Sequence, residues 1–288
     1  MRRRLILAAC VWIGAAAAYA LAMCALYLRF GEHVLAWASI GVLFAVALAH
    51  LHHLYAACDH LRALRDELDR DAEQLQHLLF LLRCVDITRP LPPLSGGCAV
   101  RPDVAAYLAG LILDMRPRAV LELGSGVSSV IIGYCLRQAG GGTLLSLDHD
   151  ADYAAQTQRW LCQHGLQDIV TVYHAPLTQV PVRTGVHQWY DLRAVGPLPS
   201  LDFVFVDGPP WSTQELARLP ALPLLEQHLS EAAVIVVDDY KRGDEREMVR
   251  RWLAGRDDWQ VLELPTQRGM AVLSRRLQSR SARAGKAQ

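Results

Sequence analysis

The stretch Val120–Ser129, V-L-E-L-G-S-G-V-S-S, decides the fold of this 288-residue chain. The apolar run Ala119–Leu123 is typical of a buried parallel strand, and helix-periodic apolar residues follow from Val130. Strand, glycine turn and helix together form the ligand-binding unit of doubly wound α/β folds. Gly124 and Gly126 would let the backbone approach a ligand closely. The stretch therefore predicts a doubly wound, Rossmann-like sheet with a ligand at this turn.

Acidic residues end the other predicted strands. Because the carboxyl ends of parallel strands meet at one edge of a sheet, these acids should line one crevice. Glu122, just before the turn, would repel a pyrophosphate but attract a ligand with a cationic group. The strands and the acids that end them are Thr143–Leu147 with Asp148, Leu201–Val206 with Asp207, and Ala233–Val237 with Asp238 and Asp239.

The segment Glu122-Leu-Gly124-Ser-Gly126 resembles motif I of class I methyltransferases that use S-adenosylmethionine (SAM). With its V-D-G-P-P and V-D-D-Y strand ends, the chain resembles a bacterial branch of these enzymes over residues 101–275. The resemblance implies a mostly parallel seven-stranded sheet whose antiparallel edge is Trp259–Leu264 and Met270–Leu273. The cofactor contacts that it implies are Glu122, Gly124, Ser125, Gly126, Ser128, Asp148, His149, His174, Ala175 and Asp207.

The acids Asp207, Asp238 and Asp239 resemble the metal ligands of catechol and sugar O-methyltransferases, and V-D-D-Y is most like the sugar-modifying ones. This resemblance implies Mg²⁺ and methyl transfer to a sugar or another small hydroxylated or envelope-related acceptor. The alternative is that these acids contact the cofactor or cap turns. Pro210 stands where the family commonly has a lysine, which argues against a catechol-like mechanism.

Further candidates for the reaction lie near these strand ends. Asp207 and Lys241 are candidate catalytic residues, although the sequence around Lys241 favours a solvated loop lysine. Aromatic residues are candidate walls of an acceptor pocket and also ordinary core residues: Trp189, Tyr190 and Trp211.

The N-terminal region has the composition of a membrane anchor. Leu5–Leu28 and His33–Cys58 contain no Asp, Glu, Lys or Arg, and a transmembrane helix needs about 20 apolar residues. The arginines at both flanks predict a two-span hairpin over residues 1–58 in the inner (cytoplasmic) membrane, with a cytoplasmic catalytic domain. A signal peptide ending at Ala18-Tyr19-Ala20 is the alternative.

Three histidines, His50, His53 and His60, share one helix face at the end of the second run. They could be residues at the membrane interface or ligands of a metal or haem.

Residues 59–86 carry leucines at heptad spacing, which predicts either a short coiled coil, and with it a homodimer, or a helix packed on its own domain. Residues 87–100 are rich in proline and glycine and indicate a linker, and 276–288 form a basic, small and polar tail. Within the catalytic domain we expect helices at Arg101–Met115 and at Glu215–Leu229, the second kinked or split by its prolines.

Composition excludes some classes of protein and leaves two other functions open. The formal net charge is zero, which does not favour nucleic acid as a partner, and seven cysteines without a C-x-x-C argue against a disulfide framework or zinc ribbon.

An NAD(P)-binding oxidoreductase would share the glycine turn and Asp148, but Ser129 stands where its fingerprint has Gly or Ala. A non-catalytic membrane scaffold with a methyltransferase-like fold is the other alternative.

Overall fold

The computed structural model describes residues 18–25, 27–29, 31–94 and 99–276. The chain divides after Arg70 into two units, residues 1–70 and 71–288. Much of the first predicted span, at residues 1–17, lies outside the described residues, and so does the predicted basic tail from residue 277.

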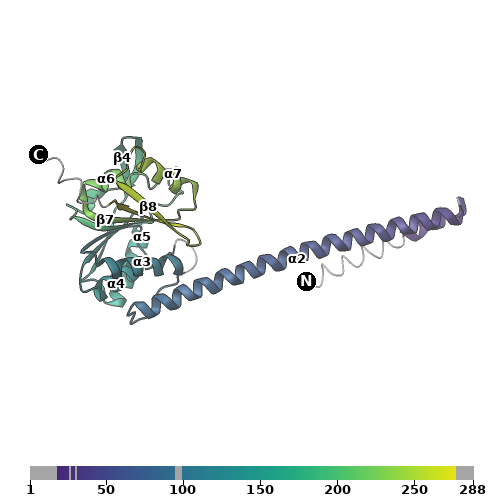
Figure 1. Ribbon diagram of the computed structural model, residues 1–288, viewed down its shortest axis with the longest axis horizontal. Coiled ribbons are helices and arrows are strands. Elements are labelled where there is room, and N and C mark those ends of the chain that lie inside the picture. Colours follow the sequence, from purple (N-terminus) through teal and green to yellow (C-terminus); the bar gives the residue numbers. More distant parts are fainter. Residues whose placement is uncertain (1–17, 26, 30, 95–98, 277–288) are drawn as a thin grey trace, which may run out of the picture. The chain divides into compact units, whose positions relative to one another are not determined.

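The longest element is α2 (Glu32–Cys84), a continuous helix of 53 residues (Figure 1). Within the described residues one helix is long and apolar enough to cross a membrane, at Ser39–Cys84, with a mean hydropathy of 1.6 in its most apolar window. Residues 18–25 and 27–29 are also helical. No boundary separates the second predicted span from the predicted heptad helix, because residues 59–84 contain neither glycine nor proline.

A seven-stranded sheet forms the centre of the second unit, in the order β3-β2-β1-β6-β7-β9-β8. The first five strands in this order are parallel, and β9 runs antiparallel to both of its neighbours. This architecture confirms the predicted mostly parallel sheet with an antiparallel edge. The strands are β1 (Ala119–Leu123), β2 (Thr143–Asp148), β3 (Val170–His174), β6 (Leu201–Val206), β7 (Leu229–Asp238), β8 (Trp259–Leu264) and β9 (Met270–Arg275).

Helices cover both faces of this sheet, which gives three layers (Figure 1). One face packs on α3 (Pro102–Met115), α4 (Val127–Gln138), α5 (Ala151–His164) and the last turns of α2. The other face packs on α6 (Ala221–Leu225) and α7 (Gly243–Trp252). Side chains of β1 alternate between the layers, since Val120 joins the first core and Leu121 the second.

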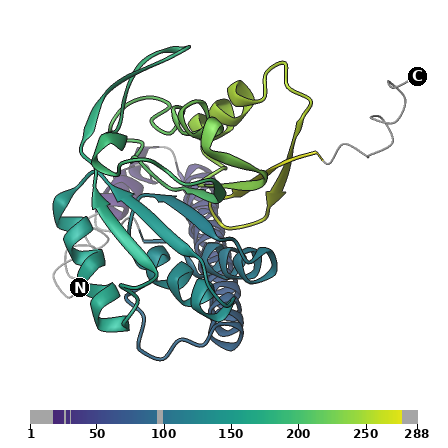
Figure 2. The same ribbon diagram turned by 90° about the vertical axis from the view of Figure 1, so that its left-hand side faces the viewer.

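A separate hairpin follows β3 and lies at the top of Figure 2. Its strands β4 (Leu177–Val182) and β5 (Gly185–Tyr190) form a separate two-stranded antiparallel sheet. The hairpin ends in two aromatic side chains, Trp189 and Tyr190, which are fully buried against the second core. A short 3-10 turn, η1 (Leu192–Ala194), then leads towards β6.

The predicted helix over Glu215–Leu229 is wrong in its first part. Residues 215–220 form turns, and the helical part is limited to α6 and the 3-10 turn η2 (Glu226–His228). Of the two prolines expected to kink or split the helix, Pro220 lies at the N-cap of α6 and Pro223 lies within this five-residue helix.

The end of α2 belongs to the second unit. Leu81 and Val85 are buried in the first core, and Leu78 packs against it. The last turns of α2 therefore pack on the chain's own domain, the second of the two alternatives, whereas Leu61, Leu64, Leu68 and Leu75 remain exposed. This packing places the start of the compact unit near residue 71 rather than residue 101.

Replacing Leu81 with alanine should lower the free energy of unfolding by about 2–5 kcal/mol, because it leaves a cavity in the first core. Leu79→Ala is the matched control, since Leu79 lies on the same helix with 59% of its surface exposed, and should cost under about 0.5 kcal/mol. Denaturant unfolding of the full chain in detergent, followed by near-ultraviolet circular dichroism, measures both. Equal effects of the two substitutions would contradict the docking of α2.

Candidate functional site

The glycine turn lies directly against the end of β6. Gly124 has φ +99°, and a Cβ atom there would meet the carbonyl group of Asp207 at 3.3 Å. A Cβ at Gly208 would lie 2.2 Å from the Tyr190 hydroxyl and 3.0 Å from the Leu123 carbonyl oxygen. Both positions therefore require glycine, because two backbone segments and a tyrosine meet there without room for a side chain.

A cavity of about 90 Å³ opens at this turn. Gly126 borders it, and a Cβ added there would meet nothing within 4 Å, so the turn is open on this side. The cavity brings together residues from the turn, from the ends of β2, β5 and β6, and from the segment before α3. Its lining is Ala99, Val100, Gly124, Ser125, Gly126, Val127, Ser128, Asp148, His149, Tyr153, Tyr190, Asp207, Gly208 and Pro210.

Asp148, at the end of β2, holds the glycine turn in place. Its carboxylate accepts hydrogen bonds from the backbone N–H of Ser125 at 3.0 Å, from the Ser125 hydroxyl at 2.6 Å and from the N–H of Asp150 at 3.0 Å. Burial opposes its ionisation, but hydrogen bonds from His149 and Ser125 outweigh burial and keep the pKa of Asp148 below its ordinary value. The site therefore holds a fixed carboxylate beside the cavity.

Glu122 lies beneath the turn rather than in the cavity. Its side chain is fully buried and accepts hydrogen bonds from the hydroxyls of Ser129 and, at 2.6 Å, Ser146. Within the described part of the chain, its other oxygen has no hydrogen-bond partner. Burial, opposed by hydrogen bonds from the serines, raises the pKa of Glu122 to about 7. Glu122 therefore lies under the loop, and not at the contact with a cationic ligand that the sequence predicts.

Tyr190 closes the cavity from the side of the hairpin. The residue is 1% exposed, and its hydroxyl has no hydrogen-bond partner among the residues that the structure describes. Burial raises the pKa of Tyr190 well above its ordinary value, so the hydroxyl keeps its proton. A buried hydroxyl without a partner costs free energy, and its place on the cavity wall allows a ligand to supply that partner.

The carboxyl ends of β6 and β7 bring three acids together, as predicted. Asp207, Asp238 and Asp239 each have a carboxylate oxygen within 4.8 Å of the other two. Asp239 has φ +60°, in the left-handed region that aspartate tolerates better than most residues, and its N–H donates to Asp238 at 2.7 Å. Burial raises the pKa of Asp207 to about 7 and that of Asp238 well above its ordinary value.

A buried arginine lies among these acids. Arg218, 4% exposed, donates through Nη2 to Asp207 at 3.1 Å and to Asp239 at 3.2 Å. Arg242 Nη1 lies 2.8 Å from the same oxygen of Asp239. Two of the three carboxylates, those of Asp207 and Asp239, therefore already have cationic partners from the chain itself, an arrangement that does not fit a resident Mg²⁺ ion.

Several predicted site residues lie outside the cavity. His174 is exposed and Ala175 is buried, and neither lines it. Lys241 is exposed, and its ammonium donates to the carbonyl oxygens of Thr266 at 2.9 Å and Gln267 at 3.2 Å, the role of a cation rather than a base. Trp189 is a fully buried core residue, and Trp211 is 64% exposed away from the cavity.

The structure adds residues that the sequence analysis did not select. Tyr153 and Gly208 line the cavity, and Arg218 joins the acids. Gly208 directly follows Asp207, so the D-G pair at the end of a predicted strand could have identified Gly208 as a site residue. Tyr153 and Arg218 carry no such signal, because Tyr153 lies on α5 and Arg218 in an irregular segment.

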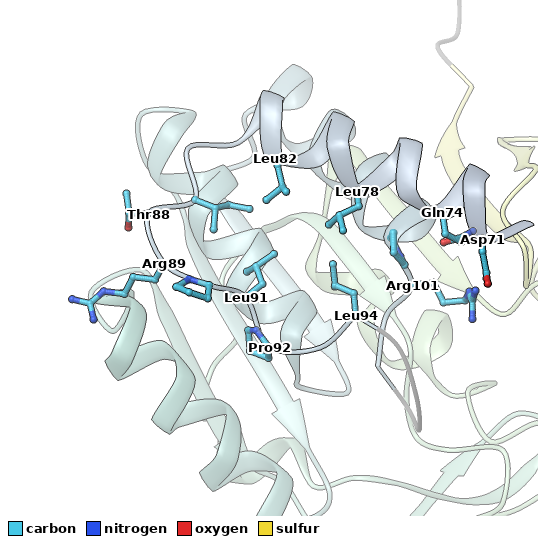
Figure 3. A pocket seen from close by; sticks show the side chains of 13 residues that line it. Asp71, Gln74, Leu78, Leu82, Thr88, Arg89, Leu91, Pro92, Leu94 and Arg101 are labelled. Atoms are coloured by element: carbon cyan, nitrogen blue, oxygen red, sulfur yellow. The ribbon is translucent and has the colours of Figure 1, made fainter. Parts of the chain in front are cut away.

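A larger hollow of about 700 Å³ lies between the end of α2 and the segment 87–94 (Figure 3). Leu78 and Leu82 of the helix face Leu91 and Leu94 across it. The hollow contains neither the glycine turn nor the strand-end acids, although its Arg101 directly follows Val100 of the smaller cavity. The candidate site is therefore the smaller cavity.

Comparison with known families supports a methyltransferase assignment for this region. Residues 121–240 match the model of a methyltransferase domain. The matched stretch contains the glycine turn and the strand-end acids from Asp148 to Asp239. No curated protein matches the chain.

Similar solved structures include three methyltransferases of low sequence identity. An O-methyltransferase from Bacillus cereus in complex with SAH is 16% identical over 70% of this chain and 91% of its own, with a TM-score of 0.47. The O-methyltransferase TomG from Streptomyces achromogenes, in complex with SAM, is 19% identical over 68% and 89%, with a TM-score of 0.46. The SAH-bound methyltransferase PaMTH1 from Podospora anserina is 14% identical over 70% and 87%, also with a TM-score of 0.46.

The buried position of Glu122 makes the stability of the fold depend on pH. Because its pKa is raised from 4.5 to about 7, the bound proton stabilises the fold fully below about pH 4.5, and this stabilisation is lost as pH rises through about 7. Between about pH 5.5 and pH 8 the free energy of unfolding should fall by about 2 kcal/mol more in the wild type than in Glu122→Gln. Denaturant unfolding at the two pH values measures this difference.

The control for this prediction is Glu263→Gln, at an exposed position of β8, which should follow the wild-type pH dependence. A Glu122→Gln variant whose stability falls with pH as steeply as that of the wild type would show that Glu122 is ionised in the folded protein throughout this range.

Proposed function

We propose that this chain is a SAM-dependent methyltransferase. The observation that carries the proposal is the glycine turn between β1 and α4, held by Asp148 at the end of the next strand and open to a cavity at Gly126. The family match over residues 121–240 supports it. The sheet supports it too, because the doubly wound NAD-binding fold has an all-parallel 3-2-1-4-5-6 order, whereas β9 here is antiparallel.

The residues around the cavity fit the polar groups of SAM, which supplies an activated methyl group when it is bound. Asp148 uses its carboxylate to fix Ser125 and can accept further hydrogen bonds from ribose hydroxyls. The unpaired hydroxyl of Tyr190 can donate to an oxygen of the ligand. At about 90 Å³ the cavity is smaller than the roughly 300 Å³ of small ligand pockets, so a complete cofactor would extend over the neighbouring surface.

For the acceptor we propose an oxygen nucleophile, in a sugar or another small hydroxylated, envelope-related molecule. Methyl transfer to a hydroxyl group requires alignment of the two reactants and removal of a proton. Asp207 lines the cavity, and its pKa, raised by burial to about 7, is suited to a general base near neutral pH. The resemblance of V-D-D-Y to sugar-modifying enzymes supports this choice of acceptor.

We further propose that the enzyme is anchored in the inner (cytoplasmic) membrane by two N-terminal spans, with its catalytic domain in the cytoplasm. The apolar part of α2 supports one of these spans by its length and composition. The arginine-rich flanks of the two uncharged runs support the orientation. The exposed leucines of α2, including Leu61, Leu64 and Leu68, suit a homodimer in which two copies of this helix cover one another.

Calorimetry on the full chain in detergent should detect binding of SAM and no binding of NAD. Asp148→Ala should weaken SAM binding by about tenfold or more, because it removes the charged partner that fixes Ser125. Asp152→Ala, at an exposed position in the first turn of α5, is the control and should bind like the wild type. Binding of NAD instead of SAM would favour the oxidoreductase alternative, and binding of neither would favour the scaffold.

Tyr190→Phe should lower the affinity for SAM without lowering the free energy of unfolding. The substitution removes a buried hydroxyl that lacks a partner, so the free energy of unfolding should stay equal or rise. SAM affinity should nevertheless fall by about fivefold, since one hydrogen bond to the ligand is lost. Tyr107→Phe on α3, outside the cavity, is the control for calorimetry and denaturant unfolding. Unchanged SAM affinity in Tyr190→Phe would place the hydroxyl outside the binding contact.

A further inference from the structure

We propose that Arg218 takes the place of a divalent metal ion among the acids at the ends of β6 and β7. It would thereby act as the positioning residue for Asp207, and the site would work without a metal. The pairing of Arg218 with the acids does not depend on which reaction the protein carries out. The role of this pairing in catalysis rests on the proposed methyltransferase function.

The position of one guanidinium nitrogen carries this inference. Nη2 of Arg218 lies 3.1 Å from Oδ1 of Asp207 and 3.2 Å from Oδ2 of Asp239. It therefore occupies the space between two of the three carboxylates. An ion that bridged the same two oxygens would need this space, since Mg²⁺ binds its oxygen ligands at about 2.0–2.1 Å.

The remaining contacts of Arg218 fix the guanidinium at this position. Nη2 also donates to the backbone carbonyl of Asp207 at 2.8 Å, Nη1 to the carbonyl of Asp238 at 3.1 Å, and Nε to the carbonyl of Pro209 at 3.4 Å. All three nitrogens are thus engaged with the ends of β6 and β7. A planar group with a fixed fork of donors can join two strand ends in this way, which a lysine ammonium cannot do.

The surroundings leave little room for the water that Mg²⁺ usually retains. Arg218, Asp238 and Asp239 are each 4% exposed or less. Glu245 of α7, also buried, adds a fourth acid, with Oε1 3.7 Å from both Arg218 and Arg242. Buried ionised groups are tolerated when they are paired and hydrogen-bonded, and Asp207, Asp239 and Glu245 each lie near an arginine of this cluster.

Arg218 affects the candidate site through its contacts with Asp207. This residue lines the cavity, and Arg218 binds both its backbone carbonyl and its Oδ1 atom. Arg218 thus fixes the direction of the Asp207 carboxylate and supplies the positive charge that a metal ion would otherwise bring. Because Arg218 does not line the cavity, it acts on the reaction only through Asp207.

The test is a titration of the full chain in detergent with Mn²⁺ alone, followed by electron paramagnetic resonance of the free ion. The wild type should show no binding up to about 1 mM. Arg218→Met removes the charge at similar length and leaves Asp207 without its cationic partner, while Arg242 still lies near Asp239 and Glu245. This variant should gain Mn²⁺ affinity by at least about tenfold, and adding Asp239→Asn should abolish the gain. Arg218→Lys, which keeps a charge, should gain less.

Two results would overturn the proposal. One is binding of Mn²⁺ by the wild type that Asp239→Asn abolishes, a result that requires no variant of Arg218 to fold. The other is a folded Arg218→Met protein that binds no more Mn²⁺ than the wild type does. A parallel SAM titration in chelator and in Mg²⁺ should give the same affinity within about twofold. Loss of SAM binding under both conditions would count against the proposed function and would leave the Mn²⁺ result unaffected.

Discussion

The site depends on one constraint, that parallel strands end at the same edge of a sheet. β1, β2, β6 and β7 all end at the edge that carries the candidate site, so Asp148, Asp207 and the pair Asp238 and Asp239 gather around the glycine turn. Much of this edge is buried, and buried carboxylates are costly unless they are protonated, hydrogen-bonded or paired with a cation. The local structure around the site follows from how each of these acids is accommodated.

Each acid is accommodated in a different way. Asp148 stays ionised because backbone and serine donors surround it, whereas Glu122 is shielded by two serine hydroxyls and has a pKa near 7. At the ends of β6 and β7, Asp207 and Asp239 are paired with arginines, whereas Asp238 accepts a hydrogen bond from the N–H of Asp239. The cavity lies between the hydrogen-bonded acid on one side and the arginine-paired acids on the other. A ligand there meets carboxylates whose directions are already fixed.

The sequence predicts the sheet well because its signals are local. The parallel strands near the site are apolar runs, β2, β6 and β7 each end at an acid, and the edge hairpin formed where expected. The site is only partly predictable, because burial depends on distant segments. Nothing in the sequence around Glu122 distinguishes a ligand contact from a position under the loop. Arg218 comes from turns that pattern analysis assigns to a helix, and its partners lie 11 and 21 residues away in sequence. Tyr190 was selected as an aromatic residue, whereas its unpaired hydroxyl becomes evident only in three dimensions.

The contacts of Arg218 also affect how the molecule opens. The turns at residues 211–220 contain little regular structure, and such segments usually unfold locally at low cost in free energy. Here local opening would withdraw Arg218 and leave Asp207 and Asp239 buried without their shared partner. These turns should therefore open together with the neighbouring strand ends rather than alone. An irregular surface segment thus becomes part of the cooperative core of the domain, through one side chain.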